Sequence, residues 1–375
     1  TGDIISVPLL RELGVKVFPV EAQMAHDPRF PTVVSPNPEN FEALTLAVQQ
    51  AKKSGTELVI GTDPDADRIA IAVHDQNGEF VPFTGNLTGA LLEEFRLSRM
   101  KEFGWIPQSG GDNVAFIKTF VTTPLQEKIA KHHGVKCINT LTGFKWIGEK
   151  LNDYEQLLQK KLEARQQPKI DYVETPADER RALLLRDSTF FAFGGEESYG
   201  YLASNNVRDK DANAAALMIC ELYASLQQRG KTLIDFRDEL YQKYGYYAES
   251  QINLYFEGAT GAQKIQNILT SYSQNPPKEI HGVPVAHVTD FTRDTIYDAD
   301  GKQIPSQSFF ILDLADGSRY AVRGSGTEPK IKFYLFGHTP VTTTVEQAMQ
   351  QTQQSLQNLK TALETDARQR AEQKI

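Results

Sequence analysis

Short apolar runs alternate with amphipathic stretches along the first hundred residues. The pattern predicts helices over 4–13, 41–53 and 90–100 and strands over 15–20, 58–60 and 69–73. Asn77-Gly78 predicts the turn that follows the last strand, and residues 82–89 form a predicted hinge. Helices that alternate with strands in this way are typical of an α/β domain.

A second block repeats the alternation. It predicts strands over 115–121, 135–139 and 189–193 and helices over 125–133, 144–151 and 212–226. The stretch 155–186 is charged and Gln-rich without an apolar period, which predicts a surface excursion of helix and loop.

The pattern changes at about residue 247. It predicts strands over 251–256 and 308–314, a hairpin partner after the turn at 315–318, and helices over 262–272 and 345–368. The predicted fold class is therefore two α/β domains, with mixed sheets and flanking helices, followed by an α+β domain. We place these domains at 1–83, 84–246 and 247–375.

The composition of the chain limits the classes of function that we expect for it. The chain has 375 residues, is 40% hydrophobic and has a net charge of −8 with scattered lysines and arginines, which argues against a nucleic-acid binder. The sequence has no apolar run of membrane-spanning length and no leader pattern, so we expect a soluble cytoplasmic protein with no membrane partner. Cys137 and Cys220 lie far apart in apolar segments and are expected to be buried free thiols.

An acidic loop, "GTDPDADR", joins the apolar runs 58–60 and 69–73. Carboxylates on alternate residues of a tight loop suit a hard divalent cation such as Mg²⁺, which predicts a metal site at Asp63, Asp65 and Asp67. An EF-hand is excluded because Arg68 and His74 occupy its glycine and glutamate positions. An aspartyl-nucleophile phosphatase would need threonine or valine where Asp67 stands. The alternative is a solvated acidic turn.

Two further motifs carry polar groups in glycine-rich loops. "FGGEESYGY" follows a predicted strand, where active-site loops of parallel sheets gather, and its Glu196 and Ser198 suit a polyol ligand. A plain glycine-rich turn would show the same pattern. "RGSGTEPKIKFY" predicts an anion cradle formed by Arg323, Ser325, Gly326 and Thr327. It is not a P-loop, and the following Lys330 and Lys332 suit the solvent face of a strand.

These motifs require a metal, a polyhydroxylated ligand and a phosphate. In this order and spacing, with "TLTGFKWIGEKL" at 140–151 and "VRDKDA" at 207–212, they resemble the α-D-phosphohexomutases, phosphoglucomutase branch, over essentially the whole chain. The resemblance implies four domains around a cleft, the last with a TATA-box-binding-protein-like sheet. It also implies exchange of the 1- and 6-phosphates of a hexose through a phosphoserine, with glucose 1,6-bisphosphate as intermediate.

The resemblance also assigns roles to residues. It implies one Mg²⁺ held by the three aspartates, with Arg68 beside the transferring phosphoryl and Lys210 as general acid or base. Glu196 and Ser198 would hold the sugar's 3- and 4-hydroxyls, and Gly143 and Lys145 lie in a loop that caps the sugar. The non-transferring phosphate would be bound by Arg323, Ser325, Gly326 and Thr327.

One departure from the family is large. Its phosphoserine lies in a Ser-His-Asn-Pro type sequence, and the nearest stretch here, "SPNPEN", lacks the histidine. The opening "TGDIISVPLL" resembles the start of the family's second domain. We therefore expect that the phosphoserine domain is missing from this chain, which alone would not turn over substrate.

Several alternatives stay open at this level. The Glu-Glu-Ser-Tyr-Gly form of the sugar loop favours glucose over mannose, but phosphomannomutase, phosphopentomutase and hexose-bisphosphate synthase share most motif residues. A non-catalytic module that binds hexose phosphates is a second class. A metal-dependent phosphatase is less favoured because it would need a nucleophile or an activated water, and the sequence identifies neither. Monomer and dimer are equally open.

Overall fold

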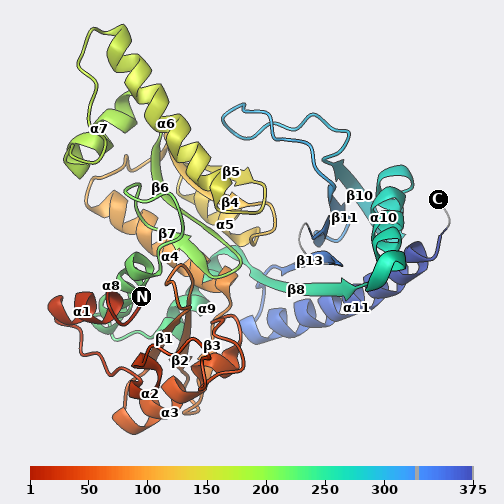
Figure 1. The fold of residues 1–375 in the computed structure, drawn as a ribbon, viewed down its shortest axis with the longest axis horizontal. Helices are drawn as coiled ribbons and strands as arrows, with labels where there is room; N and C mark the ends of the chain where they lie inside the picture. Colours follow the sequence, from red (N-terminus) through yellow and green to blue (C-terminus); the bar gives the residue numbers. More distant parts are fainter. Residues whose placement is uncertain (326–328, 374–375) are drawn as a thin grey trace. The chain divides into compact units, whose positions relative to one another are not determined.

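A computed structural model of the protein describes residues 1–325 and 329–373 (Figure 1). The chain divides into two compact units, one formed by residues 1–122 and 126–238 and the other by 123–125 and the residues from 239 onward. The first unit holds nearly all of the two predicted α/β domains, and the second holds the predicted α+β domain. The domain limits 1–83, 84–246 and 247–375 themselves stay a prediction.

The first sheet of unit one positions the acidic loop. Its antiparallel strands follow the order β1 (Leu58–Thr62), β2 (Ile69–His74) and β3 (Phe80–Pro82). Helix α3 (Thr45–Ser54), preceded by the 3₁₀ turn η1 (Phe41–Leu44), packs on this sheet. Their shared core consists of Leu44, Ala51, Val59, Ala70, Ala72 and Phe80. The buried strands therefore fix both ends of the loop that carries the three aspartates.

The second sheet has the order β5-β4-β6-β7. Strand β4 (Gly111–Thr119) runs parallel to β5 (Val135–Thr140) and β6 (Phe190–Glu196), and β7 (Gly200–Leu202) returns antiparallel to β6. The carboxyl ends of the parallel strands meet at one edge, where ligand sites gather in such sheets. The loop after β5 carries Gly143 to that edge, and Glu196 stands there as the last residue of β6.

Several helices of this part of the chain pack on these two sheets. Besides α3, the helices here are, in chain order, α1 (Ser6–Glu12), α2 (Glu21–Met24), α4 (Gly85–Glu102), α5 (Leu125–His132), α6 (Lys145–Ala164), α7 (Ala177–Asp187), α8 (Ala212–Gln227) and α9 (Leu233–Tyr244). Their residues contribute much of the unit's core. Tyr201 on β7 stacks on Phe193, which stacks on Phe116, at centroid distances of 6.4 and 6.2 Å.

Unit two is an α+β domain, as the pattern predicts. Its antiparallel sheet has the order β8 (Tyr246–Tyr255), β13 (Lys330–Thr339), β12 (Arg319–Gly324), β11 (Phe309–Leu314), β10 (Val283–Asp290) and β9 (Glu279–Ile280). Helices α10 (Gly258–Gln274) and α11 (Val345–Ala371) pack on this sheet. The α10 residue Tyr272 contacts the rings of Phe310, Tyr320 and Phe333.

Three sequence-based predictions need correction. Residues 15–20 form no strand: Pro19 has no N–H to donate to a ladder, and none of the described strands pairs with this stretch. The predicted hinge at 82–89 is largely helical, because Thr84 caps α4 by accepting a hydrogen bond from the Leu87 N–H at 3.1 Å. The stretch 155–186 does have an apolar period, since Leu158 and Leu162 extend the buried face of α6.

Both cysteines are free thiols, as expected, but they are half-buried rather than fully buried. Burial raises the pKa of the Cys220 thiol to about 11. In the described part of the chain, no helix combines the length and apolarity that crossing a membrane requires.

Glu93, on α4, is fully buried, and neither of its carboxyl oxygens has a hydrogen-bond partner among the described residues. Burial, followed by the charge of Glu94, raises its pKa well above the ordinary value. The folded protein therefore keeps a proton that the unfolded chain releases above a pH of about 4.3, and folding stability falls as pH rises from there through the folded-state pKa.

Glu93→Gln should remove this pH dependence. Relative to wild type, the variant should gain about 1.4 kcal/mol of unfolding free energy per pH unit between the two pKa values. Urea unfolding at a series of pH values measures the difference. Glu163→Gln, at an exposed helix position, is the control and should give a flat difference. A flat difference for Glu93→Gln as well would contradict the account.

Candidate active site

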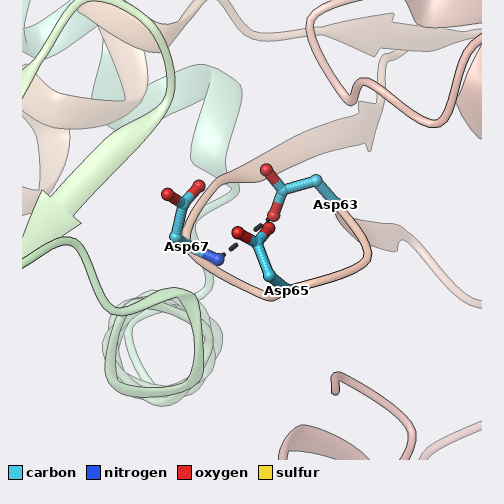
Figure 2. A group of neighbouring side chains, drawn as sticks. All are labelled: Asp63, Asp65 and Asp67. Carbon is cyan, nitrogen blue, oxygen red and sulfur yellow. Dashed lines mark hydrogen bonds between the residues drawn. The ribbon is translucent and has the colours of Figure 1, made fainter.

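The acidic loop brings three carboxylates together between β1 and β2 (Figure 2). Asp63, Asp65 and Asp67 each offer an oxygen, and these oxygens lie within 4.8 Å of one another. Asp63 Oδ1 accepts hydrogen bonds from the backbone N–H groups of Asp67 at 3.1 Å and Arg68 at 3.0 Å. Ala66, buried at the tip with φ of 56°, makes the tight left-handed turn that this arrangement needs.

The carboxylates of the loop are electrostatically crowded. Burial is the main cause that raises the pKa of Asp63 to about 6, and the neighbouring Asp67 and Asp65 add to it. The hydrogen bond that Asp63 accepts from the Arg68 N–H acts in the opposite direction. Asp67 Oδ1 is buried and has no hydrogen-bond partner among the described residues. An all-oxygen donor set with a buried, unsatisfied oxygen fits a hard divalent cation, so the triad could hold a metal ion.

Arg68 and Lys210 supply positive charge next to the triad. The Arg68 Nε lies 3.7 Å from both Asp63 Oδ2 and Asp67 Oδ1. Its Nη1 lies 3.2 Å from Glu39 Oε1, a partner that sequence reasoning missed because it lies 29 residues away in an irregular loop. The Arg68 side chain is 37% exposed, so it is accessible to an incoming anion.

The Lys210 ammonium lies 2.9 Å from Asp67 Oδ2 and 2.9 Å from Asp209 Oδ1, and it sits over the ring of Phe144. Burial alone would lower the pKa of Lys210, but its hydrogen bonds to Asp209 and Asp67 outweigh burial and raise it. The lysine is therefore held protonated and positively charged beside the triad.

Lys210→Met should tighten Mg²⁺ binding about tenfold, because a divalent ion no longer competes with the ammonium for Asp67. Isothermal titration calorimetry measures the affinity. Lys210→Arg keeps the charge and should bind Mg²⁺ as wild type does. Unchanged or weaker binding by Lys210→Met would show that the ion does not bind at Asp67.

The turn between β6 and β7 carries the predicted sugar residues. Glu196 ends β6, is 6% exposed, and its Oε1 accepts a hydrogen bond from the Gly143 N–H at 2.7 Å. Burial raises the pKa of Glu196. The hydrogen bond from the Gly143 N–H and the charge of Lys210 act in the opposite direction but do not cancel the effect of burial. Ser198 is half-buried in the same turn, and Lys145 is exposed at the start of α6.

Backbone hydrogen bonds join this turn and the Lys210 segment to the acidic loop. The Ile69 N–H, just after the loop, donates to Tyr199 O at 3.0 Å, and the Ala212 N–H donates to Ala66 O at 3.0 Å. Gly85 approaches so closely that a Cβ there would lie 2.1 Å from Glu197 O. The structure thus brings the predicted metal, sugar and lysine residues of unit one together.

The predicted phosphate loop belongs to unit two. Arg323 is half-buried on β12 and pairs in register with Lys332 on β13. The Ser325 N–H donates to Lys330 O at 2.9 Å and closes the base of the loop. Gly326 and Thr327 lie outside the described residues. Arg323 and Lys332 therefore place two positive charges side by side on neighbouring strands.

Comparison with known protein families shows to which family this chain belongs. Residues 1–78 match the model of phosphoglucomutase/phosphomannomutase alpha/beta/alpha domain II, and residues 85–159 and 171–244 match that of domain III. The chain belongs to the phosphoglucomutase/phosphomannomutase family. The family resemblance read from the motifs is confirmed.

Relatives in this family include phosphoglucomutases of Staphylococcus aureus. That of strain MRSA252 is 36% identical over 332 residues, and that of strain USA300 is 35% identical over 333 residues. Each match covers 87% of this chain and 53% of the relative. The chain thus spans about half the length of the curated relatives it matches.

Two solved structures share the fold. The parafusin (phosphoglucomutase) of Paramecium, in its open form, gives a TM-score of 0.56 at 18% identity, covering 92% of this chain and 52% of that one. A phosphoglucomutase/phosphomannomutase family protein of Burkholderia thailandensis gives 0.53 at 14% identity, covering 95% and 57%. The predicted fold class is confirmed.

Proposed function

We propose that this chain supplies the metal-binding, sugar-binding and phosphate-binding parts of a phosphoglucomutase, which interconverts glucose 1-phosphate and glucose 6-phosphate. The observation that carries the proposal is the convergence of the acidic triad, Lys210 and Glu196 within one unit of a family member. Its ligands would be hexose phosphates and one Mg²⁺, in a cytoplasmic protein that does not bind nucleic acid.

Each residue has a definite task in this proposal. Asp63, Asp65 and Asp67 would hold Mg²⁺, which when bound would supply positive charge for a phosphoryl group. Arg68 adds a planar pair of donors for the phosphoryl oxygens, and Lys210 donates or accepts the proton at the sugar hydroxyl. A phosphoserine is the proposed phosphoryl donor, with glucose 1,6-bisphosphate as the reoriented intermediate.

The remaining groups hold the sugar and its second phosphate. Glu196 and Ser198 accept and donate hydrogen bonds at the sugar's hydroxyls, under the cap that begins at Gly143 and Lys145. The proposed binding groups for the non-reacting phosphate are Arg323, Ser325, Gly326 and Thr327. A carboxylate that is already buried exchanges little water when the sugar arrives, which favours a strong charge-assisted hydrogen bond.

Calorimetric titration with glucose 1-phosphate, with and without Mg²⁺, tests the proposal. We expect binding that Mg²⁺ strengthens and that is tighter for glucose 1-phosphate than for mannose 1-phosphate or ribose 1-phosphate. Tighter binding of the mannose or ribose compound would move the assignment to a phosphomannomutase or phosphopentomutase. Absence of binding to all three would overturn it.

A further inference from the structure

Tyr172 lies in the loop between α6 and α7, with its ring packed against two guanidinium groups. The Arg180 Cζ lies 4.8 Å from the ring centroid and the Arg208 Cζ lies 5.2 Å from it. Arg180 belongs to α7 and is 4% exposed, whereas Arg208 belongs to the irregular segment 203–210. Since a cation is attracted to an aromatic face, the ring ties that segment to the helical excursion.

Hydrogen bonds reinforce the same contact. The Asn205 Nδ2 donates to the Tyr172 hydroxyl at 2.7 Å. The Arg180 guanidinium donates both to the Tyr172 carbonyl oxygen and to Asn206 Oδ1. Arg208 pairs with Glu155 of α6. Three polar residues of the segment, Asn205, Asn206 and Arg208, are thus bonded to α6, α7 or the loop between them.

The loop that presents Tyr172 is itself preorganised. Asp171 Oδ1 accepts hydrogen bonds from the N–H groups of Val173 at 2.9 Å and Glu174 at 3.0 Å. The Gln159 side chain on α6 bonds both backbone groups of Ile170, at 2.9 and 3.3 Å. Because these bonds fix the residues on both sides of Tyr172, little conformational entropy is left to lose when the ring packs.

The other end of the segment reaches the active site. Lys210, two residues after Arg208, contacts Asp67 Oδ2 at 2.9 Å. A Cβ at Gly148 of α6 would lie only 2.7 Å from Arg208 O, so the backbone at Arg208 lies close against α6. The Ala212 N–H bond to Ala66 O holds the chain on the far side of Lys210, so the contacts of Arg208 are what fix the chain on its near side.

We propose that the excursion formed by the end of α6, α7 and the loop between them is a clamp that positions Lys210 beside the acidic triad. Tyr172 is the positioning residue of this clamp. Its ring packs against Arg180 and Arg208, and its hydroxyl accepts a hydrogen bond from Asn205. The clamp itself does not depend on the proposed function. Its expected effect on metal binding, however, rests on the proposed function. The charged stretch predicted as a surface excursion thus has a role at the site.

Limited trypsin digestion tests the clamp, because cleavage after Arg208 or Lys210 requires the segment to open. Tyr172→Ala should raise the cleavage rate at these two positions about tenfold, as followed by mass spectrometry. Asn205→Ala, which removes one hydrogen bond and leaves the ring in place, should raise it about threefold. Val173→Ala, at a neighbour that is 80% exposed, should change nothing. A wild-type cleavage rate in Tyr172→Ala would overturn the clamp.

Mg²⁺ titration tests the link to Lys210. Tyr172→Ala should bind Mg²⁺ about threefold tighter than wild type, in the direction expected for Lys210→Met, because the ammonium leaves Asp67. In the Lys210→Met background the same substitution should have no further effect. General loss of stability would instead weaken Mg²⁺ binding in both backgrounds, and either that result or an equal effect in both would overturn the positioning role.

Trypsin digestion and Mg²⁺ titration test the clamp and the proposed function separately. If the wild-type protein bound no Mg²⁺, the proposed function would fail, and the trypsin result would still decide whether the clamp exists.

Discussion

Asp65→Asn should weaken Mg²⁺ binding by at least about 100-fold, since a hard divalent cation depends on the charge of its few carboxylate ligands. Asp65 is the most informative of the three positions because it is exposed. Asp63, in contrast, holds the loop backbone through its Oδ1, and Asp67 pairs with Lys210. Loss of binding in Asp65→Asn would therefore report the missing ligand and not a disrupted loop.

Calorimetry in dilute buffer measures this effect, with circular dichroism to confirm that the variant is folded. Asp112→Asn is the matched control, because Asp112 is exposed on β4 outside the acidic loop and the substitution removes the same charge. Equal losses of Mg²⁺ affinity in the two variants would indicate that the ion responds only to the protein's overall negative charge. The triad would then not be the metal site.

Glu196→Gln should weaken glucose 1-phosphate binding about 10- to 100-fold. The substitution keeps the side chain's shape and still allows an oxygen to accept the Gly143 N–H, but it removes the charge that strengthens hydrogen bonds from sugar hydroxyls. Mg²⁺ affinity should stay within about twofold of wild type, since Glu196 is not one of the three proposed ligands.

Glu197→Gln is the matched control for this prediction. Glu197 is the next residue, and its Oε2 accepts a hydrogen bond from the Thr119 hydroxyl at 3.3 Å. This variant should bind glucose 1-phosphate within about threefold of wild type. If Glu197→Gln lost as much affinity as Glu196→Gln, the assignment of Glu196 to the sugar would be wrong.

The parts of the fold that the sequence predicts well are those with regular apolar periods. Strands β1 and β2 and helix α8 are found within two residues of their predicted limits, because buried strands and amphipathic helices leave a direct pattern. The stretch 15–20 shows that alternation alone is insufficient. A strand also needs a partner, and the sequence contains no information on that pairing at this position.

The candidate site shows the same division. The motifs identify Asp63, Asp65 and Asp67 correctly as a convergent group, because alternate residues of one short loop are local. Contacts between distant segments were missed, including the ion pair of Arg68 with Glu39 and the contact of Lys210 with the ring of Phe144. Neither partner forms a pattern with its neighbours in sequence, so only the folded chain reveals it.

Paramagnetic relaxation by Mn²⁺, as a substitute for Mg²⁺, tests most directly whether a cation binds the acidic loop within the site that holds Lys210 and Glu196. The account predicts that Mn²⁺ broadens the amide resonances of Asp65 and Asp67 most strongly and also broadens those of Lys210 and Gly143. Asp65→Asn should abolish this pattern. Broadening centred on another part of the chain, or retained in Asp65→Asn, would contradict the account.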